Sequence, residues 1–217
     1  MSSIVRPEFG ESLPTTVGPK WRALGGRWRA LIIAAAVIVA LALIYFLLLA
    51  GSPTRQVAVA APVPFELEYD GDLLQQRLTV GRESLRLESP AGVTPKRTFT
   101  VKPLLLPAYK GSISGVLPLQ AELLSRQMSA INSSFITIAE APVLVNEQPG
   151  YEILFQISEA GKTVYGRRVM LFPPNSGARA GVDVTMTAPR SSQTLTAPVI
   201  AQQPPLREPF ESLVVGN

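Results

Sequence analysis

The chain has 217 residues, of which 47% are hydrophobic and 17% charged, and its formal net charge is +4. It contains neither cysteine nor histidine. The missing cysteines exclude disulfides, thiol nucleophiles and thiolate metal sites, and the missing histidines exclude the most common general base and transition-metal ligand. Most catalytic templates are therefore excluded, and we expect no catalytic residue and no cofactor.

Residues 1–29 are expected to form a flexible, basic cytoplasmic tail. The first 19 residues are rich in Gly, Pro, Ser and Thr and show no periodic apolar pattern. Five cations and two carboxylates precede residue 30, so the remaining chain is nearly neutral. A nearly neutral domain lacks the basic surface that binds phosphate backbones, and no nucleic-acid partner is expected.

The run Ala30–Ala50 is unbroken in its apolar character. A helix of this length is about 31 Å long, which matches the hydrocarbon thickness of a bilayer, and the sequence predicts one transmembrane helix with the lipid bilayer as its partner. The cations on its N-terminal side predict a cytoplasmic N-terminus. The alternative is a signal peptide cleaved after Ala60, although the apolar run is longer than such peptides usually carry. A lipoprotein anchor is not expected, because acylation at a lipobox needs a cysteine and the chain has none.

Residues 51–64 are rich in Ala, Val and Pro and predict an extended stem linker. Residues 65–217 have the usual length of one domain with its own core, and we expect them to form a single extracytoplasmic domain.

The domain begins with strictly alternating apolar and polar residues, which predict a half-buried strand over 65–70. Similar alternation predicts strands at 84–88, at 98–102 before Pro103, and at 182–187. Residues 151–159 and 163–172 predict a hairpin around Ala160-Gly161.

Apolar residues at spacings of three and four predict a helix over 118–131, and the spacing from Leu206 to Val214 predicts a short closing helix. The helix over 118–131 has a stripe expected to face the core: Leu117, Ala121, Leu124, Met128 and Ile131. The predicted class is α+β, with one antiparallel sheet flanked by helices.

Three local strings, at 85–92, 145–151 and 163–168, resemble the PsbP-like family as it occurs in small bacterial extracytoplasmic proteins. They correspond to an early strand and turn, the Pro-Gly-aromatic entry to the hairpin, and the return strand. The resemblance extends from Leu85 to the C-terminus. It implies an antiparallel sheet flanked by helices, used as a non-catalytic accessory or protein-binding module of membrane assemblies. The chain departs from the family in having no lipobox cysteine and no metal-binding histidine, so a metal role is not carried over.

Four carboxylates, of Glu66, Glu68, Asp70 and Asp72, alternate along the first strand and would project from one face. Oxygen ligands of this kind suit Ca²⁺, which makes them weak candidates for a metal site. The alternative is an ordinary solvated face that discourages edge pairing.

Arg167 shares strand parity with Tyr165 and with apolar residues, so it is expected among buried neighbours. One interpretation is a ligand or partner contact made by Tyr165 and Arg167. The others are a bulge at Gly166 or a structural ion pair with Glu152.

The function expected from these patterns is that of a membrane-anchored, extracytoplasmic binding or accessory module with an envelope membrane protein as its partner. It would lie at the cell membrane, with the N-terminus in the cytoplasm. One alternative is a carrier or sensor of small or lipidic ligands, which predicts an apolar pocket between sheet and helix. Another is a histidine-independent hydrolase, for which the Lys110-Gly111-Ser112 string offers only a weak Ser/Lys pair.

Overall fold

A computed structural model describes residues 25–49, 54–92, 96–174, 179–192 and 194–216, with backbone alone at residues 26, 29, 32 and 42–49. The chain divides into two units, with the boundary between Gly51 and Ser52. Residues 1–24 of the predicted basic tail lie outside the described residues.

The first unit contains helix α2 (Gly26–Leu49), which includes nearly all of the apolar run predicted to span a bilayer. Ala50 and the side chains of residues 42–49 complete that run and lie outside the described residues. Among the residues that the structure describes, no helix combines the length and the apolar character needed to cross a membrane.

The second unit is built on a seven-stranded antiparallel sheet with the strand order β3-β4-β5-β9-β8-β7-β6. The strands β6 to β9 are antiparallel neighbours in chain order at one end of the sheet. The strand β9 also pairs with β5, which comes much earlier in the chain. In sheet order the bounds are β3 (Gln75–Gln76), β4 (Leu85–Glu88), β5 (Thr98–Leu105), β9 (Ala180–Pro189), β8 (Lys162–Leu171), β7 (Gln148–Glu159) and β6 (Ile136–Val145).

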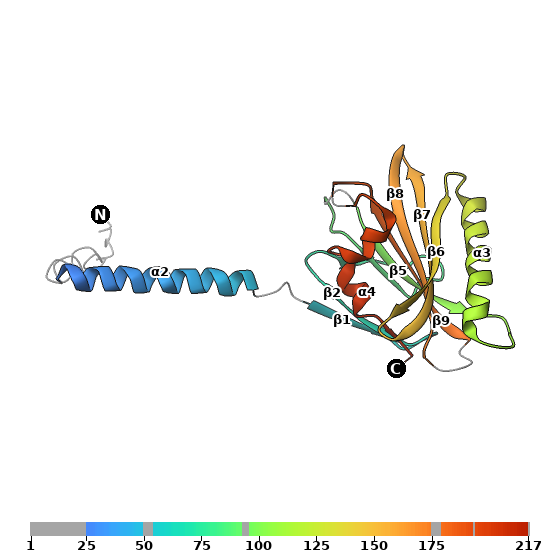
Figure 1. Cartoon of the computed structure of the whole chain (residues 1–217), viewed down its shortest axis with the longest axis horizontal. Coiled ribbons are helices and arrows are strands. Elements are labelled where there is room, and N and C mark those ends of the chain that lie inside the picture. The colour runs from blue at the N-terminus through green and yellow to red at the C-terminus, as the bar shows by residue number, and fades with distance from the viewer. Residues whose placement is uncertain (1–24, 50–53, 93–95, 175–178, 193, 217) are drawn as a thin grey trace, which may run out of the picture. The chain divides into compact units, whose positions relative to one another are not determined.

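Helix α3 (Ile113–Ile131) covers part of one face of this sheet, and the start and the end of the second unit cover the other face (Figure 1). The start supplies β1 (Thr54–Val59) and β2 (Phe65–Asp70), and the end supplies the 3₁₀ helix η1 (Ala197–Gln202), α4 (Arg207–Glu211) and β10 (Val214–Val215). Strands β1, β2 and β10 form a second, antiparallel sheet in that order.

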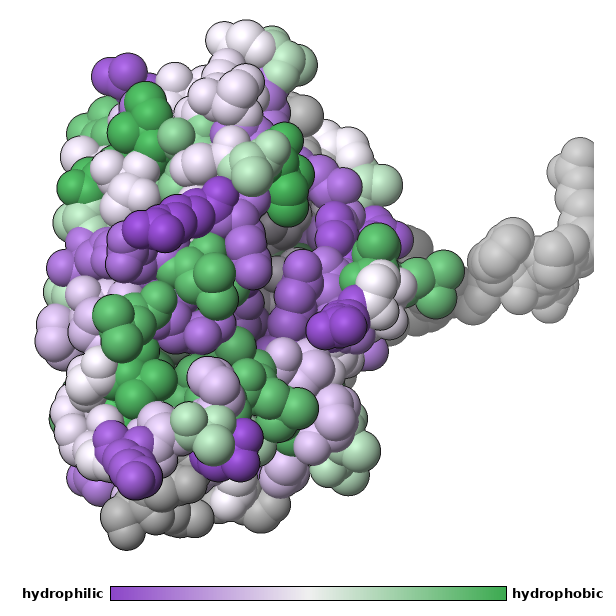
Figure 2. Space-filling model, turned by 90° about the vertical axis from the view of Figure 1, so that its right-hand side faces the viewer, coloured by the Kyte–Doolittle hydropathy of each residue, from purple (hydrophilic) through white to green (hydrophobic). Residues whose placement is uncertain are grey.

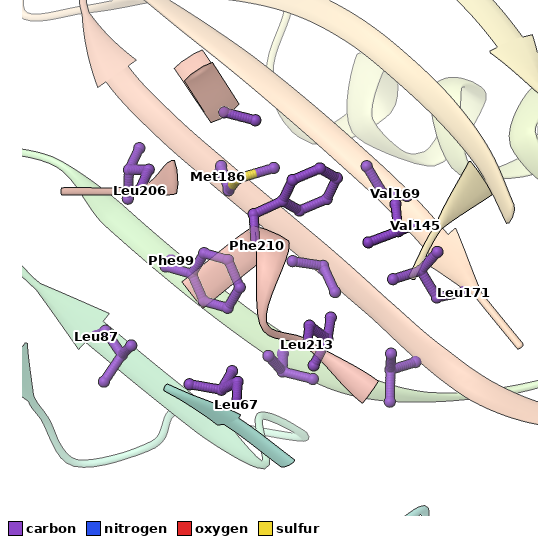
Figure 3. Close-up of a cluster of buried hydrophobic side chains, with 14 of the residues drawn as sticks. Leu67, Leu87, Phe99, Val145, Val169, Leu171, Met186, Leu206, Phe210 and Leu213 are labelled. Atoms are coloured by element: carbon purple, nitrogen blue, oxygen red, sulfur yellow. The ribbon is translucent and has the colours of Figure 1, made fainter. Parts of the chain in front are cut away.

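The larger apolar core lies between the large sheet and these terminal elements. Phe210 and Leu213 reach into it from the C-terminal segment and meet Phe99, Met186 and Leu67 (Figure 3). A smaller core lies under α3, where Leu117, Ala121 and Leu124 pack on Ile153, Met170 and Phe172 of the opposite sheet face. The α+β class is thus present, but the predicted single sheet is wrong, because strands β1, β2 and β10 form a second antiparallel sheet.

The alternating strings form strands as predicted. In β2 the apolar residues Phe65, Leu67 and Tyr69 are buried, while the acidic residues between them are not. The β7–β8 hairpin turns through Ala160 and Gly161, which both have positive φ, as a two-residue turn that matches strand twist requires.

The stem prediction needs correction, because residues 54–59 form β1 and pair with the whole of β2. The folded unit therefore begins before Phe65. The strand β2 lies between β1 and β10, so its acidic residues do not protect a sheet edge. The sequence could not show that β2 is a central strand, because one of its partners, β10, lies at the other end of the domain sequence.

Two predicted ends are also corrected. The strand β5 continues through Pro103 to Leu105. From Lys102 to Leu105 it pairs with β9 on one side only, because β4, on its other side, ends opposite Val101. A proline is tolerated there because the side of β5 without a neighbouring strand requires no backbone N–H donor. The helix α3 begins at Ile113, five residues before Pro118, and its last residue Ile131 is 88% exposed instead of facing the core.

Candidate functional site

Arg167 lies on the sheet face that the C-terminal segment covers. Its Nη2 is 2.8 Å from Oε2 of Glu152, which lies diagonally across the β7–β8 ladder. The two side chains are only 13% and 17% exposed, respectively. The ion pair with Glu152, one of the alternatives that the sequence left open, is therefore present. Among the described residues, neither Nε of Arg167 nor Oε2 of Glu152 has a hydrogen-bond partner, so the contact between the two side chains is an ion pair without hydrogen-bond geometry.

The guanidinium of Arg167 also lies over the ring of Phe210 in α4, with its carbon 4.7 Å from the ring centroid. This is the geometry of a cation–π contact. Tyr165 is buried on the same strand face. Arg167 thus binds the C-terminal segment to the sheet, and a ligand or partner contact by Tyr165 and Arg167 stays a prediction.

Gly166 does not introduce a bulge, since β8 keeps an unbroken register with both of its neighbours. A Cβ on Gly166 would be 2.0 Å from the ring of Phe155, which lies directly opposite. The glycine therefore makes room for an aromatic ring. Because the register is unbroken, Arg167 shares a strand face with Tyr165 and has little exposure, as the sequence indicated.

The acidic residues of β2 and the turn after it are not grouped as metal ligands would be. Oδ1 of Asp70 accepts hydrogen bonds from the backbone N–H groups of Asp72 (2.8 Å) and Leu73 (3.3 Å), so this carboxylate closes the turn after β2. Among the described residues, no group of three or more acidic side chains is placed to hold a metal ion. The Ca²⁺ interpretation of Glu66, Glu68, Asp70 and Asp72 is therefore unsupported.

The weak Ser/Lys pair before α3 also finds no support. Ser112 precedes the helix, and its Oγ lies 2.8 Å from Oγ of Ser114, a neutral hydroxyl that cannot serve as the base.

An apolar pocket of about 340 Å³ lies between the N-terminal end of α3 and the β6–β7 hairpin, and we call it the hairpin pocket. Ile113 and Leu117 of the helix face Val143, Leu144 and Tyr151 of the hairpin across it. Its size falls in the range of small-ligand sites. This is the pocket between sheet and helix that the carrier interpretation predicted.

The outer side of α3 is also apolar. Leu119 and Leu123 are 68% and 49% exposed and lie one turn apart, on the opposite side from the buried stripe. Figure 2 views the side of the molecule that carries α3, where hydrophobic residues interrupt the hydrophilic surface. We call Leu119 and Leu123 the outer ridge.

A charged cluster on β4 was not predicted from the sequence. The carboxylate of Glu88 forms ion pairs with Arg86 and Lys96, each with a nitrogen 2.6 Å from one of its oxygens, and Glu83 pairs with Arg86 at 3.2 Å. Burial alone would raise the pKa of the Glu88 carboxyl, but hydrogen bonds from Lys96 and Arg86 and their positive charges lower it below its usual value. The signal in the sequence was the pair of opposite charges two residues apart on one strand face.

No family model matches the chain, and no curated protein matches its sequence. Solved structures do match. The solution structure of cyanobacterial PsbP (CyanoP) from Synechocystis sp. PCC 6803 superposes with a TM-score of 0.53 at 8% identity, over 75% of this chain and 92% of that one.

Two further structures are more distant in shape. The structure of LpqN from Mycobacterium tuberculosis, described as involved in cell envelope biogenesis, has a TM-score of 0.48 at 10% identity and covers 76% of this chain and 93% of that one. A protein from Bacteroides thetaiotaomicron has a TM-score of 0.43 at 13% identity over 70% of this chain, which spans 45% of its length. The resemblance noted from the three sequence strings is thus supported by structure, and the second unit has a PsbP-like α+β fold.

Proposed function

We propose that the chain is a membrane-anchored, non-catalytic accessory module that binds a partner protein outside the cytoplasm. The outer ridge carries the proposal: a helix that already buries one apolar stripe exposes two leucines one turn apart on its other side. Exposed apolar side chains grouped in this way are typical of interaction surfaces.

The neighbouring edge strand β6 favours docking through side chains over the addition of a partner strand. Its register shifts between Thr137 and Ala139, and Pro142 follows three residues later. A bulge and a proline both interrupt the row of backbone groups that an added strand would use.

The binding proposal is tested by capturing partners from gently solubilised native membranes with the full chain as bait. The double variant Leu119→Glu/Leu123→Glu should lose a stoichiometric partner. The matched control is Leu78→Glu/Leu195→Glu, because both leucines are exposed elsewhere on the molecule. Equal capture by both double variants would refute binding through the outer ridge.

The anchoring proposal depends on the apolar run Ala30–Ala50 and on the cations before it. Since the chain has no cysteine, single cysteines can report topology without background. We expect Ser192→Cys to react with a membrane-impermeant maleimide on intact cells and Ser12→Cys to react only after lysis. The opposite pattern would reverse the orientation, and release of the protein by an alkaline wash would exclude a spanning helix.

A second candidate function, carriage of a small apolar or lipidic molecule, is favoured by the hairpin pocket. Ser114 lines this pocket, so Ser114→Trp should fill it and remove small molecules that co-purify with the full chain. Ser133→Trp, which changes an exposed turn after α3, is the control. Identical bound molecules in both variants would argue against this function.

A further inference from the structure

A second cavity, of about 350 Å³, lies between the C-terminal end of α3 and the part of the large sheet that the helix leaves uncovered. Its walls come from α3 and from β5, β7, β8 and β9. We call it the α3–sheet cavity. It shares no lining residue with the hairpin pocket at the other end of the helix.

One wall of the α3–sheet cavity is rich in hydrogen-bond donors. It carries the ammonium of Lys102 and the guanidinium of Arg168. Arg168 is held by Asp183, which accepts from Nε at 2.8 Å and from Nη2, so these bonds use two of five N–H donors. Asn132 presents its amide NH₂, because its Oδ1 accepts two hydrogen bonds from Ser134.

Asp183 balances the charge of Arg168, so the charge of this lining depends on Lys102. None of the described residues that line the cavity is acidic. Lys102 lies 3.9 Å from Glu83, but that carboxylate also pairs with Arg86, and Arg86 and Lys96 share Glu88. The cluster thus sets three cations against two carboxylates, which leaves one positive charge in excess, and Lys102 is the member of the cluster that lines the cavity.

The apolar part of the lining consists of Met128 and Ile131 of α3, Phe135 after the helix, and Ile157 of β7. Phe135 is held in place by the ring of Phe155, with the two centroids 5.2 Å apart. A ligand that satisfies both the polar and the apolar part of the lining needs a compact anionic group and an apolar group.

We propose that the α3–sheet cavity binds a small organic anion with an apolar substituent. Its carboxylate or phosphate accepts hydrogen bonds from Lys102 and Arg168, and its apolar part packs on Met128 and Phe135. Hydrogen bonds between ionised partners are stronger than neutral ones, which gives the site its preference for an anion. The site requires neither the membrane anchor nor the partner protein.

The test is a titration of the full chain, held in nanodiscs of phosphatidylcholine, with hexanoate followed by ligand-observed NMR. Hexanamide is the neutral isostere, and acetate lacks the apolar part. We expect saturable binding of hexanoate about ten-fold tighter than that of either control. Equal binding of hexanoate and hexanamide would overturn the proposal.

Variants locate the binding. Gln127→Glu brings a carboxylate into the cavity lining with almost no change of shape, and should weaken hexanoate binding by about ten-fold. The control is Gln202→Glu, an equal charge change at an exposed residue elsewhere. Lys102→Gln should also weaken binding and Lys110→Gln should not. Equal effects within both pairs would show that hexanoate binds outside this cavity.

The natural anion could be a free molecule or a lipid headgroup. Phosphatidylglycerol in the nanodiscs that competes with hexanoate, while phosphatidylcholine does not, would support the site and assign it to headgroups. Hexanoate binding that is unchanged by phosphatidylglycerol would support a soluble anion.

Discussion

At the scale of single residues, Gly166 shows how one absent Cβ permits the packing of an aromatic ring. The ring of Phe155 occupies the space that a side chain at Gly166 would need. The sequence offered a bulge at Gly166 as one interpretation, but a glycine inside a strand can also permit a close approach, and only the facing strand decides between them.

The substitution Gly166→Ala should destabilise the protein by about 1–3 kcal/mol, because the new methyl group must displace the Phe155 ring from a packed core. Urea unfolding measures the loss. Gly115→Ala is the control, since nothing lies within 4 Å of its Cβ position in α3, and it should stabilise by about 0.5–1 kcal/mol. A Gly166→Ala variant as stable as the wild type would contradict the close packing.

Arg167 is a second residue whose side chain contributes to the stability of the fold. Arg167→Met should cost about 3–5 kcal/mol, because it leaves the poorly exposed carboxylate of Glu152 without its cation. Adding Glu152→Leu should restore part of that stability. A double-mutant cycle on urea unfolding measures the coupling, and additive effects of the two changes would show that the ion pair contributes nothing.

At the scale of elements, the strand β4, which lies between β3 and β5, is stabilised by charge. The pKa of the Glu88 carboxyl is lowered in the folded state, so its stabilising contribution is fully present above its unfolded pKa. That contribution is lost as the pH falls through the lower, folded pKa.

Glu88→Gln should therefore destabilise the protein near neutral pH, and its difference from the wild type should shrink as the pH falls from about 7 to about 3. Thermal melting at each pH measures the difference. Glu159→Gln, at the exposed tip of the β7–β8 hairpin, is the control and should change little. A difference for Glu88→Gln that is independent of pH would mean that its ionised form is not stabilised by folding.

At the scale of the whole molecule, the turn between β6 and β7 holds the C-terminal segment. Asn146 donates from Nδ2 to the carbonyl groups of Glu211 (2.6 Å) and Leu213 (3.0 Å). The buried amide of Gln148 donates to the carbonyl of Val215 and accepts from its N–H, as a neighbouring strand would. These two side chains join parts of the chain about 65 residues apart.

Gln148→Ala should cost about 1–3 kcal/mol, because it leaves two buried backbone groups of Val215 without partners. It should also speed the hydrogen exchange of the Val215 amide more than that of the β7–β8 hairpin. Gln156→Ala, on the same strand, is the control. Unchanged exchange at Val215 would show that the C-terminal segment is held by its apolar contacts alone.

The sequence by itself determined where most strands and helices lie, because apolar residues at spacings of two, and of three and four, reflect local geometry. It also indicated which side chains of β2 enter the core and, for α3, Leu117, Ala121 and Leu124, and it offered the ion pair of Arg167 with Glu152 as one alternative. These features depend on neighbours within one element or one hairpin.

Only the tertiary structure decided the rest. The pairing of β1 and β10 with β2, the hold of Asn146 and Gln148 on the C-terminal segment, and the α3–sheet cavity all join residues distant in the chain. Local periodicity carries no information about such contacts, because they depend on which faces meet once the elements have packed.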